Sequence, residues 1–301
     1  MGKRLTREEI LEAVRAVKYP EKNDYYSLSS ADGFAFLGAA KACLGVFPEE
    51  LHQVVKRRYR LNAPNRIRNQ LVPADAYYTY TLWPCAELFI ASGERSLLED
   101  LINILGRMGY YRNGLYAYCN VPIDYVVPNA TPCAAWLYCS VWMVGTAMNL
   151  LVPFLDRQMD GNWEYTNENE TEVFAREDSA HLSFIVYLLK EVAPFFAGNP
   201  LQKRLEEAVN DSLDVLLDMN RKEIQMGSCG WGPGFLMAAR HYDEELRERA
   251  FEAAWAVLKD EKANFRARAV SAWAFSRFYP YEGERAESWA TKKERGLTRP
   301  Y

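Results

Sequence analysis

The chain has 301 residues, of which 49% are hydrophobic and 25% are charged, so it can form a large core and is not globally disordered. A formal net charge of −4 and an isoelectric point near 5.6 give no basic stripe, which argues against nucleic acid as the main partner. No apolar run reaches the roughly 18 residues of a membrane span, and the N-terminus lacks the apolar core of a signal peptide. The six cysteines contain no CxxC pair, which indicates reduced thiols in a cytoplasmic protein without a bound metal.

Helical periodicity dominates the chain, and two kinds of predicted helix take turns along it. One kind is amphipathic, with a charged face and an apolar stripe, and the other is apolar on nearly every face and therefore buried. The predicted amphipathic helices span residues 6–18, 48–60, 94–108, 199–219 and 242–260. The predicted buried helices span residues 30–47, 74–92, 131–152, 178–192, 232–242 and 266–279. The two kinds alternate along the chain, except that 178–192 follows 131–152 with no amphipathic helix between them.

The predicted buried helices begin about 36 to 54 residues apart, a spacing typical of a repeated helical hairpin. Six such hairpins can close into a ring with the apolar helices inside. The pattern looks like the α/α toroid of six-hairpin glycosidases, terpenoid cyclases and protein prenyltransferases. We therefore expect an all-α fold, a single (α/α)6 toroid over residues 1–281, followed by a polar tail over 282–301. An open superhelix is the alternative, but its inner helices would carry more charge.

The loops that precede the predicted inner helices are rich in aromatic and hydrogen-bonding residues, and in a toroid they meet around a central pocket. Planar rings beside amides and carboxylates suit a sugar, although each single ring can instead fill the core. The predicted substrate-binding residues are Tyr77, Tyr78, Tyr125, Asn129, Trp163, Tyr165, Glu177 and Trp231. We expect Trp163 and Tyr165 to be partly exposed at one end of the ring, close to His181.

One stretch of the chain, residues 122–189, carries a more specific pattern. It contains PIDYVVPNATPCAAWLY, LDRQMDGNWEY and EDSAHLSFIVYLL. This resembles a recurring block in toroid proteins linked to polysaccharide metabolism, and it implies a carbohydrate-related role without specifying a reaction. The matching positions are Asp124, Asn129, Thr131, Gln158, Asp160, Gly161, Trp163, Tyr165, Asp178 and His181. The block usually has an aromatic residue before the histidine, where this chain has Ser-Ala.

Asp178 and His181 stand three residues apart at the start of a predicted inner helix, so they share one helix face. That arrangement indicates an acid/base pair, and the competing interpretation is a capping aspartate beside a core histidine. Glycoside hydrolysis generally needs a second carboxylate roughly 5 to 10 Å away, for which Asp75 and Asp124 are the candidates. The predicted function is cleavage of a glycosidic bond in an oligo- or polysaccharide by a hydrolase, or by a lyase or epimerase acting on a uronate. No cofactor is predicted, and the other two histidines, His52 and His241, are expected at the surface.

Two other functions stay open. The stretch AREDSA is similar to the D-x-D-D-T-A motif of class II terpenoid cyclases, with Ala175 in place of the first acid. That resemblance implies an enzyme that binds a prenyl diphosphate, with Glu177 and Asp178 as proton donors. The third function is a non-catalytic toroid that serves as a scaffold in a polysaccharide-related assembly. Six arginines at loops or inner-helix starts would suit a uronate or a phosphate if two of them face the pocket: Arg66, Arg68, Arg112, Arg176, Arg266 and Arg268.

Overall fold

The computed structural model describes residues 5–18, 20, 28–58, 65–67, 70–72, 78–94, 96–109, 114–119, 125–222, 231–240 and 247–279. Within these residues, six α-helices form an inner layer: α2 (Leu28–Cys43), α4 (Thr79–Ala91), α6 (Ala130–Ser140), α8 (Ser179–Val192), α10 (Gly232–Arg240) and α12 (Phe265–Phe278). The outer layer consists of α1 (Arg7–Arg15), α3 (Glu49–Arg58), α5 (Ser96–Leu105), α7 (Val144–Leu155), α9 (Pro200–Lys222) and α11 (Arg247–Lys259).

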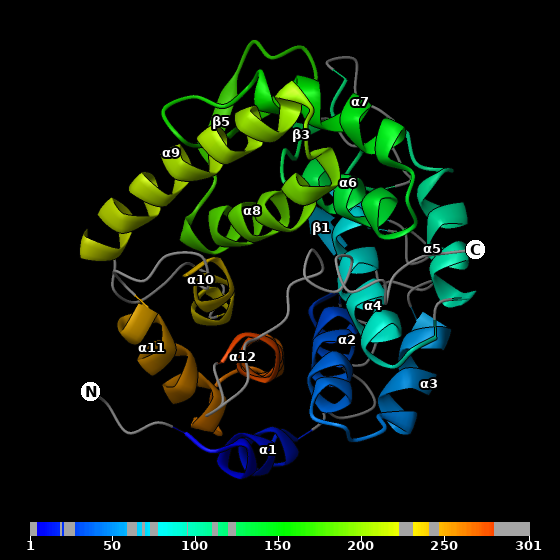
Figure 1. Cartoon of the computed structure of the whole chain (residues 1–301), viewed down its shortest axis with the longest axis vertical. Helices are drawn as coiled ribbons and strands as arrows, with labels where there is room; N and C mark the ends of the chain where they lie inside the picture. Colours follow the sequence, from blue (N-terminus) through cyan, green and yellow to red (C-terminus); the bar gives the residue numbers. More distant parts are fainter. Residues whose placement is uncertain are drawn as a thin grey trace.

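The inner helices form a closed ring. Each contacts the next along the chain, and α12 contacts α2, so the first and last hairpins of the described part lie side by side. Every outer helix packs against an inner one (Figure 1). The structure therefore confirms the all-α fold and the closed toroid, and excludes the open superhelix. The proposed domain boundary at residue 281 and the polar tail lie outside the described residues.

Caps fix where several helices begin. At α1 the Thr6 side chain accepts a hydrogen bond from the backbone of Glu9, whose carboxylate accepts one in return, which forms a capping box. The Asp178 carboxylate accepts two backbone hydrogen bonds at the start of α8, and Asn264 accepts one from Ala267 at the start of α12. Polar caps therefore start helices of both layers, the outer α1 as well as the inner α8 and α12.

The helix predicted over residues 131–152 is in fact two helices, so the assignment of its second half to the inner layer was wrong. The chain turns after α6 because Trp142 adopts a left-handed backbone with φ 66°. Its N–H bonds to the carbonyl of Cys139, and the N–H of Met143 bonds to that of Tyr138, which together form a Schellman motif. The chain then returns as α7 in the outer layer. Glycine is usual at the left-handed position, and the tryptophan gave no signal of a helix end.

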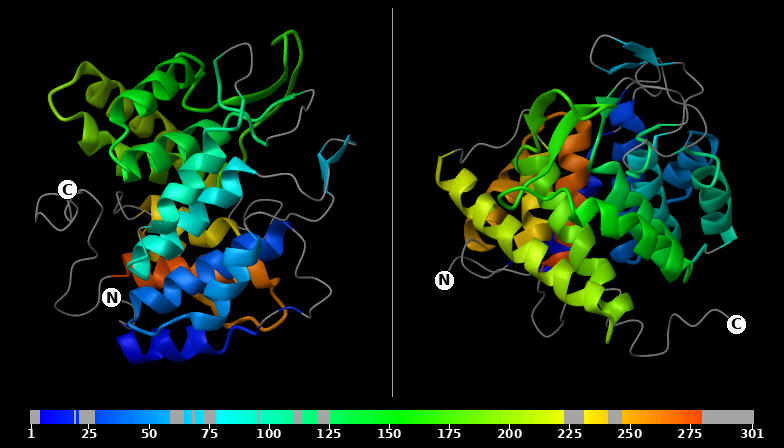
Figure 2. Two further views of the ribbon diagram at one scale, coloured as in Figure 1. Left: turned by 90° about the vertical axis from the view of Figure 1, so that its right-hand side faces the viewer. Right: turned by 90° about the horizontal axis from the view of Figure 1, so that it is seen from above.

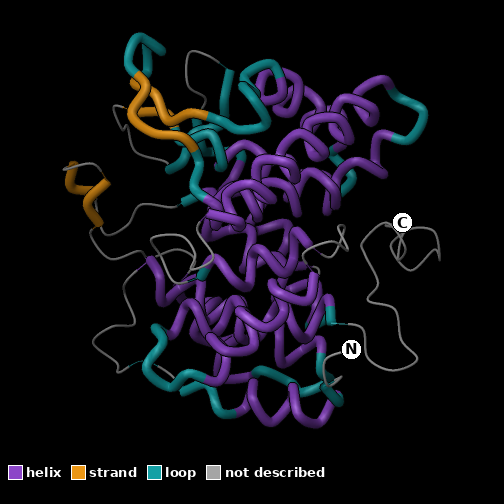
Figure 3. Tube along the Cα trace, turned by 90° about the vertical axis from the view of Figure 1, so that its left-hand side faces the viewer, coloured by secondary structure: helices purple, strands orange, loops and turns teal. Residues whose placement is uncertain are grey.

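Two small antiparallel sheets accompany the helices. One pairs β1 (Asn65–Ile67) with β2 (Gln70–Val72), and the other has the order β3 (Tyr125–Val126), β4 (Glu164–Asn167) and β5 (Val173–Arg176). Figure 2 shows the β1–β2 hairpin projecting from the helices, and Figure 3 shows both sheets on one side of the helical body. Since β3 and β5 lead into the first turns of α6 and α8, the three-stranded sheet lies at the end of the ring where inner helices begin.

Aromatic side chains fill the middle of the ring. Five of them, from five different inner helices, have centroids 5.1–6.3 Å from their neighbours and are at most 1% exposed: Phe36, Trp83, Phe184, Phe235 and Trp273. Large rings packed in this way, some edge-on and some tilted, give the core much of its stability. The two ends of the ring are therefore separated by a packed aromatic layer.

A close approach between α2 and α12 depends on glycine. A Cβ atom at Gly33 would lie 2.6 Å from the ring of Phe265 and 3.4 Å from the Cα of Arg266. Any larger residue would push the first turn of α12 away from α2. The glycine therefore brings Asp32, its neighbour in the chain, close to Arg266.

One expected surface residue is buried. His52 on α3 is 1% exposed, its Nε2 lies 3.1 Å from the hydroxyl of Ser92, and its ring packs edge-on against Phe89. The expectation of a surface position was wrong because charged neighbours in the sequence belong to the other face of α3. His241 lies outside the described residues. Among the helices that are described, none has the length and apolar character needed to cross a membrane.

Candidate active site

The first turns of the inner helices meet at one end of the ring, which we call the N-terminal end. Asp178 and His181 come from the start of α8, Asp32 from the first turns of α2, and Arg266 from the first turn of α12. Trp231 directly precedes α10. Because the inner helices run in the same direction, side chains far apart in the sequence gather in one place.

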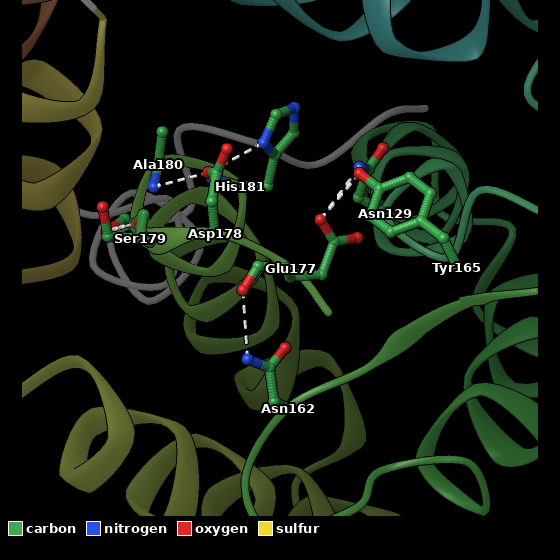
Figure 4. Close-up of polar contacts among 9 residues, drawn as sticks. Asn129, Asn162, Tyr165, Glu177, Asp178, Ser179, Ala180 and His181 are labelled. Atoms are coloured by element: carbon green, nitrogen blue, oxygen red, sulfur yellow. Dashed lines mark hydrogen bonds and ion pairs between the residues drawn. The ribbon is translucent and has the colours of Figure 1, made fainter. Parts of the chain in front are cut away.

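Asp178 and His181 form a direct pair (Figure 4). The Nδ1 of His181 lies 2.9 Å from Oδ1 of Asp178, and the same oxygen accepts the backbone N–H groups of Ala180 at 2.9 Å and His181 at 3.0 Å. Their side chains are 33% and 22% exposed, so both reach solvent. An ionised carboxylate at Nδ1 keeps the proton on that nitrogen and leaves Nε2 to exchange a proton.

Glu177 occupies a different environment from its neighbour Asp178. It is 1% exposed, and its Oε2 accepts hydrogen bonds from the Tyr165 hydroxyl at 2.7 Å and from the Asn129 amide at 3.4 Å. The same amide donates to the Tyr165 hydroxyl at 2.7 Å. Figure 4 shows the Glu177 side chain directed toward Asn129 and Tyr165, while Asp178 is directed toward His181. Two adjacent carboxyl groups thus face different partners.

The DGNW segment holds Glu177 through its backbone. The Asn162 amide donates to the Glu177 carbonyl at 3.1 Å, and the Glu177 N–H donates to the Trp163 carbonyl at 3.0 Å. Gly161, with φ 72°, lets the turn approach α9 so closely that a Cβ there would lie 2.3 Å from the Asp211 carbonyl oxygen. The DGNW segment therefore positions one buried carboxyl group through two backbone contacts.

The charges at this end of the ring are strongly coupled. Burial raises the pKa of Glu177 to about 7, although His181, Tyr165 and Asn129 all act in the opposite direction. Burial would also raise the pKa of Asp178, but hydrogen bonds from the His181 ring and the backbone lower it to about 2. Burial would lower the pKa of His181, but Asp178 and Glu177 outweigh it and raise that pKa. Near neutral pH Asp178 is therefore ionised and favours the protonated form of His181, while Glu177 is close to its titration point.

A second charged pair lies beside the first. Arg266 forms an ion pair with Asp32 at 2.7 Å, and its guanidinium carbon lies 3.1 Å from the centroid of Trp231 and 5.0 Å from that of Tyr80. The carboxylate of Asp32 is fully buried, and burial raises its pKa to about 6 although the charge of Arg266 lowers it. The Trp231 ring in turn stands perpendicular to the His181 ring, with centroids 5.3 Å apart.

The structure brings together several predicted site residues. Asn129, Tyr165, Glu177, Asp178 and His181 share one hydrogen-bonded and charged region, and Trp231 borders it. Tyr165 is partly buried, in agreement with its expected partial exposure. Asp75, Tyr77 and Asp124 lie outside the described residues, as does the side chain of Tyr125.

Two of the predicted sugar-binding rings are fully buried in the core, and a third, Trp231, is 5% exposed. Trp163 is fully buried, stacks on Phe154 with centroids 4.5 Å apart, and donates to the Phe154 carbonyl at 2.9 Å. The expectation that it is partly exposed was wrong, because α7 supplies a stacking partner. Tyr78 is likewise fully buried and packs edge-on against Tyr118. In this conformation neither ring is accessible to a ligand.

Sequence reasoning missed Asp32 and left Arg266 as one of six undifferentiated arginines. The available signal was a single acidic residue inside a helix that is otherwise apolar on nearly every face. A buried carboxylate of this kind needs a cationic partner, and the arginine at the start of another inner helix could have been considered for that role. Within the described residues, no three His, Cys, Asp or Glu side chains gather as metal ligands.

No protein-family model and no curated protein matches this sequence. Solved structures do match its fold. A family 76 glycoside hydrolase from a bovine Bacteroides thetaiotaomicron strain has a TM-score of 0.58 over 90% of this chain and 77% of that chain, at 7% identity. The Lin0763 protein from Listeria innocua has a TM-score of 0.56 over 99% of this chain and 100% of that chain, at 12% identity. At such identities the similarity establishes the fold alone: this chain is an α/α toroid that shares its architecture with a glycoside hydrolase.

Proposed function

We propose that this protein is a carbohydrate-active enzyme that cleaves a glycosidic bond of an oligo- or polysaccharide at the N-terminal end of its inner ring. The Asp178–His181 pair carries the proposal. It combines a short contact, two partly exposed side chains and a raised pKa of the histidine, all at an end of the ring where polar groups gather. The toroid fold of a known glycoside hydrolase supports the class of substrate.

The proposed chemistry uses the ionised Asp178 and the protonated form of His181 that it favours. The ionised Asp178 holds the proton on Nδ1 of His181, and the protonated Nε2 gives its proton to the leaving glycosidic oxygen as the bond to the sugar carbon breaks. In hydrolysis, water forms the new bond to that carbon and returns a proton to Nε2. In elimination, water takes a proton from the neighbouring sugar carbon, the electrons of that C–H bond form a carbon–carbon double bond as the C–O bond breaks, and Nε2 regains a proton from the solvent. Glu177, buried behind the pair, sets the local charge through its own protonation.

The proposal includes a reducing compartment such as the cytoplasm. No disulfide forms among the five cysteines within the described residues, which are Cys43, Cys85, Cys119, Cys133 and Cys139. Four of them are buried. Reduced, buried cysteines are typical of proteins that stay in such a compartment.

The test is a product analysis with the purified full chain. Neutral and uronate-containing oligosaccharides are incubated with the wild type and with Asp178→Asn, and the masses of the products are measured by mass spectrometry. Products that together gain one water indicate hydrolysis, and products with no added water indicate elimination. We expect the wild type to shorten at least one glycan class and Asp178→Asn to do so far more slowly. If no glycan of either class is cleaved, the proposal fails.

A non-catalytic scaffold is the second candidate, and one observation favours it. The middle of the ring is filled by aromatic side chains, and Trp163 and Tyr78 are buried. A scaffold predicts glycan binding without turnover, which equilibrium binding measured beside the product analysis would detect. A prenyl diphosphate serves as the third ligand in that measurement, because specific binding of it alone would favour the terpenoid-cyclase interpretation.

A further inference from the structure

Arg266 is held on several sides. Its ion pair with Asp32 joins α12 to α2, and its guanidinium lies over Trp231 with the central carbon 3.1 Å from the ring centroid. The side chain is 13% exposed, so these contacts are largely shielded from water. An arginine can make both contacts at once because its guanidinium is planar and always charged.

The pair reaches His181 through Trp231. The indole stands at 90° to the imidazole at 5.3 Å, so a displacement of the indole moves one wall of the histidine's surroundings. The Phe184 ring also contacts His181, with the two ring centroids 5.7 Å apart. The charged groups that act on His181 are Asp178 and Glu177 at the start of its own helix and Arg266 from α12.

We propose that Asp32 and Arg266 are positioning residues that hold Trp231 against His181 and thereby fix the orientation of the proton-transferring imidazole. The expected effect on turnover rests on the proposed function, whereas the contacts among these residues exist without a substrate. Asp32 holds the guanidinium, the guanidinium holds the indole, and the indole packs against the imidazole, while Asp178 bonds to its Nδ1.

Unsatisfied polar atoms support a positioning role over a purely stabilising one. The Nε of Arg266 and the Nε1 of Trp231 are both buried and have no hydrogen-bond partner. Leaving such groups unpaired costs free energy, so an arrangement selected for stability alone would have paired them. At the opposite end of the ring, Arg277 forms ion pairs with Glu87 and Glu191, and none of these three residues has a buried atom without a partner.

That opposite cluster supplies a matched control. Arg277 resembles Arg266 in its exposure of 12%, in its buried carboxylate partners and in its position over aromatic rings, Tyr187 and Phe278. Arg266→Lys and Arg277→Lys therefore make the same chemical change, which keeps the charge and removes the planar group. Only the first change touches the residues around His181.

The readout is the imidazole NMR spectrum of His181, titrated with pH in the full chain without ligand. The chain has three histidines, so a His181→Gln sample assigns the signal. We expect Arg266→Lys to move the His181 ring signals, because the Trp231 ring current changes, and Arg277→Lys to leave them in place. The double variant Asp32→Asn with Arg266→Gln removes the pair without leaving a buried charge, and it should raise the pKa of His181 because the nearby cation is lost.

On a glycan that the wild type cleaves, we expect Arg266→Lys to lower kcat about 10- to 100-fold with little change in KM, as misplacement of a reacting group does. Arg277→Lys should retain the wild-type kcat. If the His181 signals and pKa in Arg266→Lys and in the double variant equal those of the wild type, the positioning role is wrong. That result is independent of whether any glycan is cleaved, so it separates the failure of this inference from the failure of the proposed function.

Discussion

The two ends of the inner ring carry the same kind of group in different surroundings. At the end where the inner helices finish, Arg277 pairs with Glu87 and Glu191, and the second oxygen of Glu87 accepts hydrogen bonds from Trp83 at 3.3 Å and Tyr187 at 2.9 Å. At the N-terminal end, Arg266 pairs with Asp32, and buried atoms of Arg266, Trp231 and Glu177 lack a hydrogen-bond partner.

This difference indicates that the cluster around Arg277 stabilises the fold, whereas the N-terminal end carries the proposed chemistry. The Glu87–Arg277–Glu191 cluster joins α4, α8 and α12, and none of its three residues has a buried polar atom without a hydrogen-bond partner. This is expected of a buried network that fixes one arrangement of helices. The N-terminal end leaves polar atoms unsatisfied and exposes Asp178 and His181. A buried polar group without a partner calls for an explanation, and a catalytic role is one such explanation. Four changes would break or sharpen this comparison.

The largest effect is expected on turnover at the N-terminal end. Asp178→Asn should lower kcat by roughly two to four orders of magnitude, the usual contribution of a general acid or base, while asparagine keeps the helix cap. His181→Gln should show a similar loss, and the double variant should lose little more, because the two act as one unit. Steady-state kinetics and thermal unfolding measure the two effects separately. A capping role alone would give normal turnover in Asp178→Asn.

The opposite end should respond in stability only. Arg277→Met leaves Glu87 and Glu191 buried without their cation, which costs about 3 to 5 kcal/mol for a broken buried ion pair. Chemical denaturation monitored by circular dichroism measures this loss. Turnover of the fraction that remains folded should match the wild type, and a large loss of kcat there would erase the distinction between the two ends.

Glu177→Gln should change how stability depends on pH. Because the pKa of Glu177 is raised to about 7 in the folded chain, the folded state retains a proton that the unfolded state releases near pH 4.5. Stability contributed by this group therefore falls as pH rises from about 4.5 through 7 and is level above that. Relative to the wild type, Glu177→Gln should gain up to about 3 kcal/mol between pH 5 and pH 8. Urea unfolding at several pH values tests this, and a pH-independent difference would contradict it.

The smallest effect is expected at Tyr165. Tyr165→Phe removes the hydroxyl that donates to Glu177 at 2.7 Å and should cost about 1 kcal/mol in the free energy of unfolding. Since that hydrogen bond favours the ionised carboxylate, its loss should also raise the pKa of Glu177 further. The same urea series measures both. Unchanged stability at every pH would show that the hydroxyl does not hold the carboxyl group.

The layered toroid was predictable because amphipathic and fully apolar helices alternate at a regular spacing. The main error in the helix assignment arose at Trp142, where a left-handed residue other than glycine ends α6. That error had a consequence at the site. Without α7 as a separate outer helix, Phe154 could not be recognised as the partner that buries Trp163, so the tryptophan was expected at the surface.

The site was predictable where its parts are local and not where they are distant. Asp178 and His181 share one helix turn, and their pairing follows from their spacing. Asp32 and Arg266 meet only because the ring closes between α2 and α12 at Gly33, which no short-range pattern reveals. The burial of Glu177 depends on Asn129 and Tyr165 from two other elements, so its raised pKa was equally hidden.

Two histidines at different places allow the most direct test of the site. His181 lies at the N-terminal end, whereas His52 is buried between Ser92 and Phe89 near the end of α4. We predict that an oligosaccharide cleaved by the wild type, added to Asp178→Asn to slow turnover, shifts the imidazole NMR signals of His181 and leaves those of His52 unchanged. Saturable binding of that oligosaccharide with no shift at His181 would contradict a glycan site at this end of the ring.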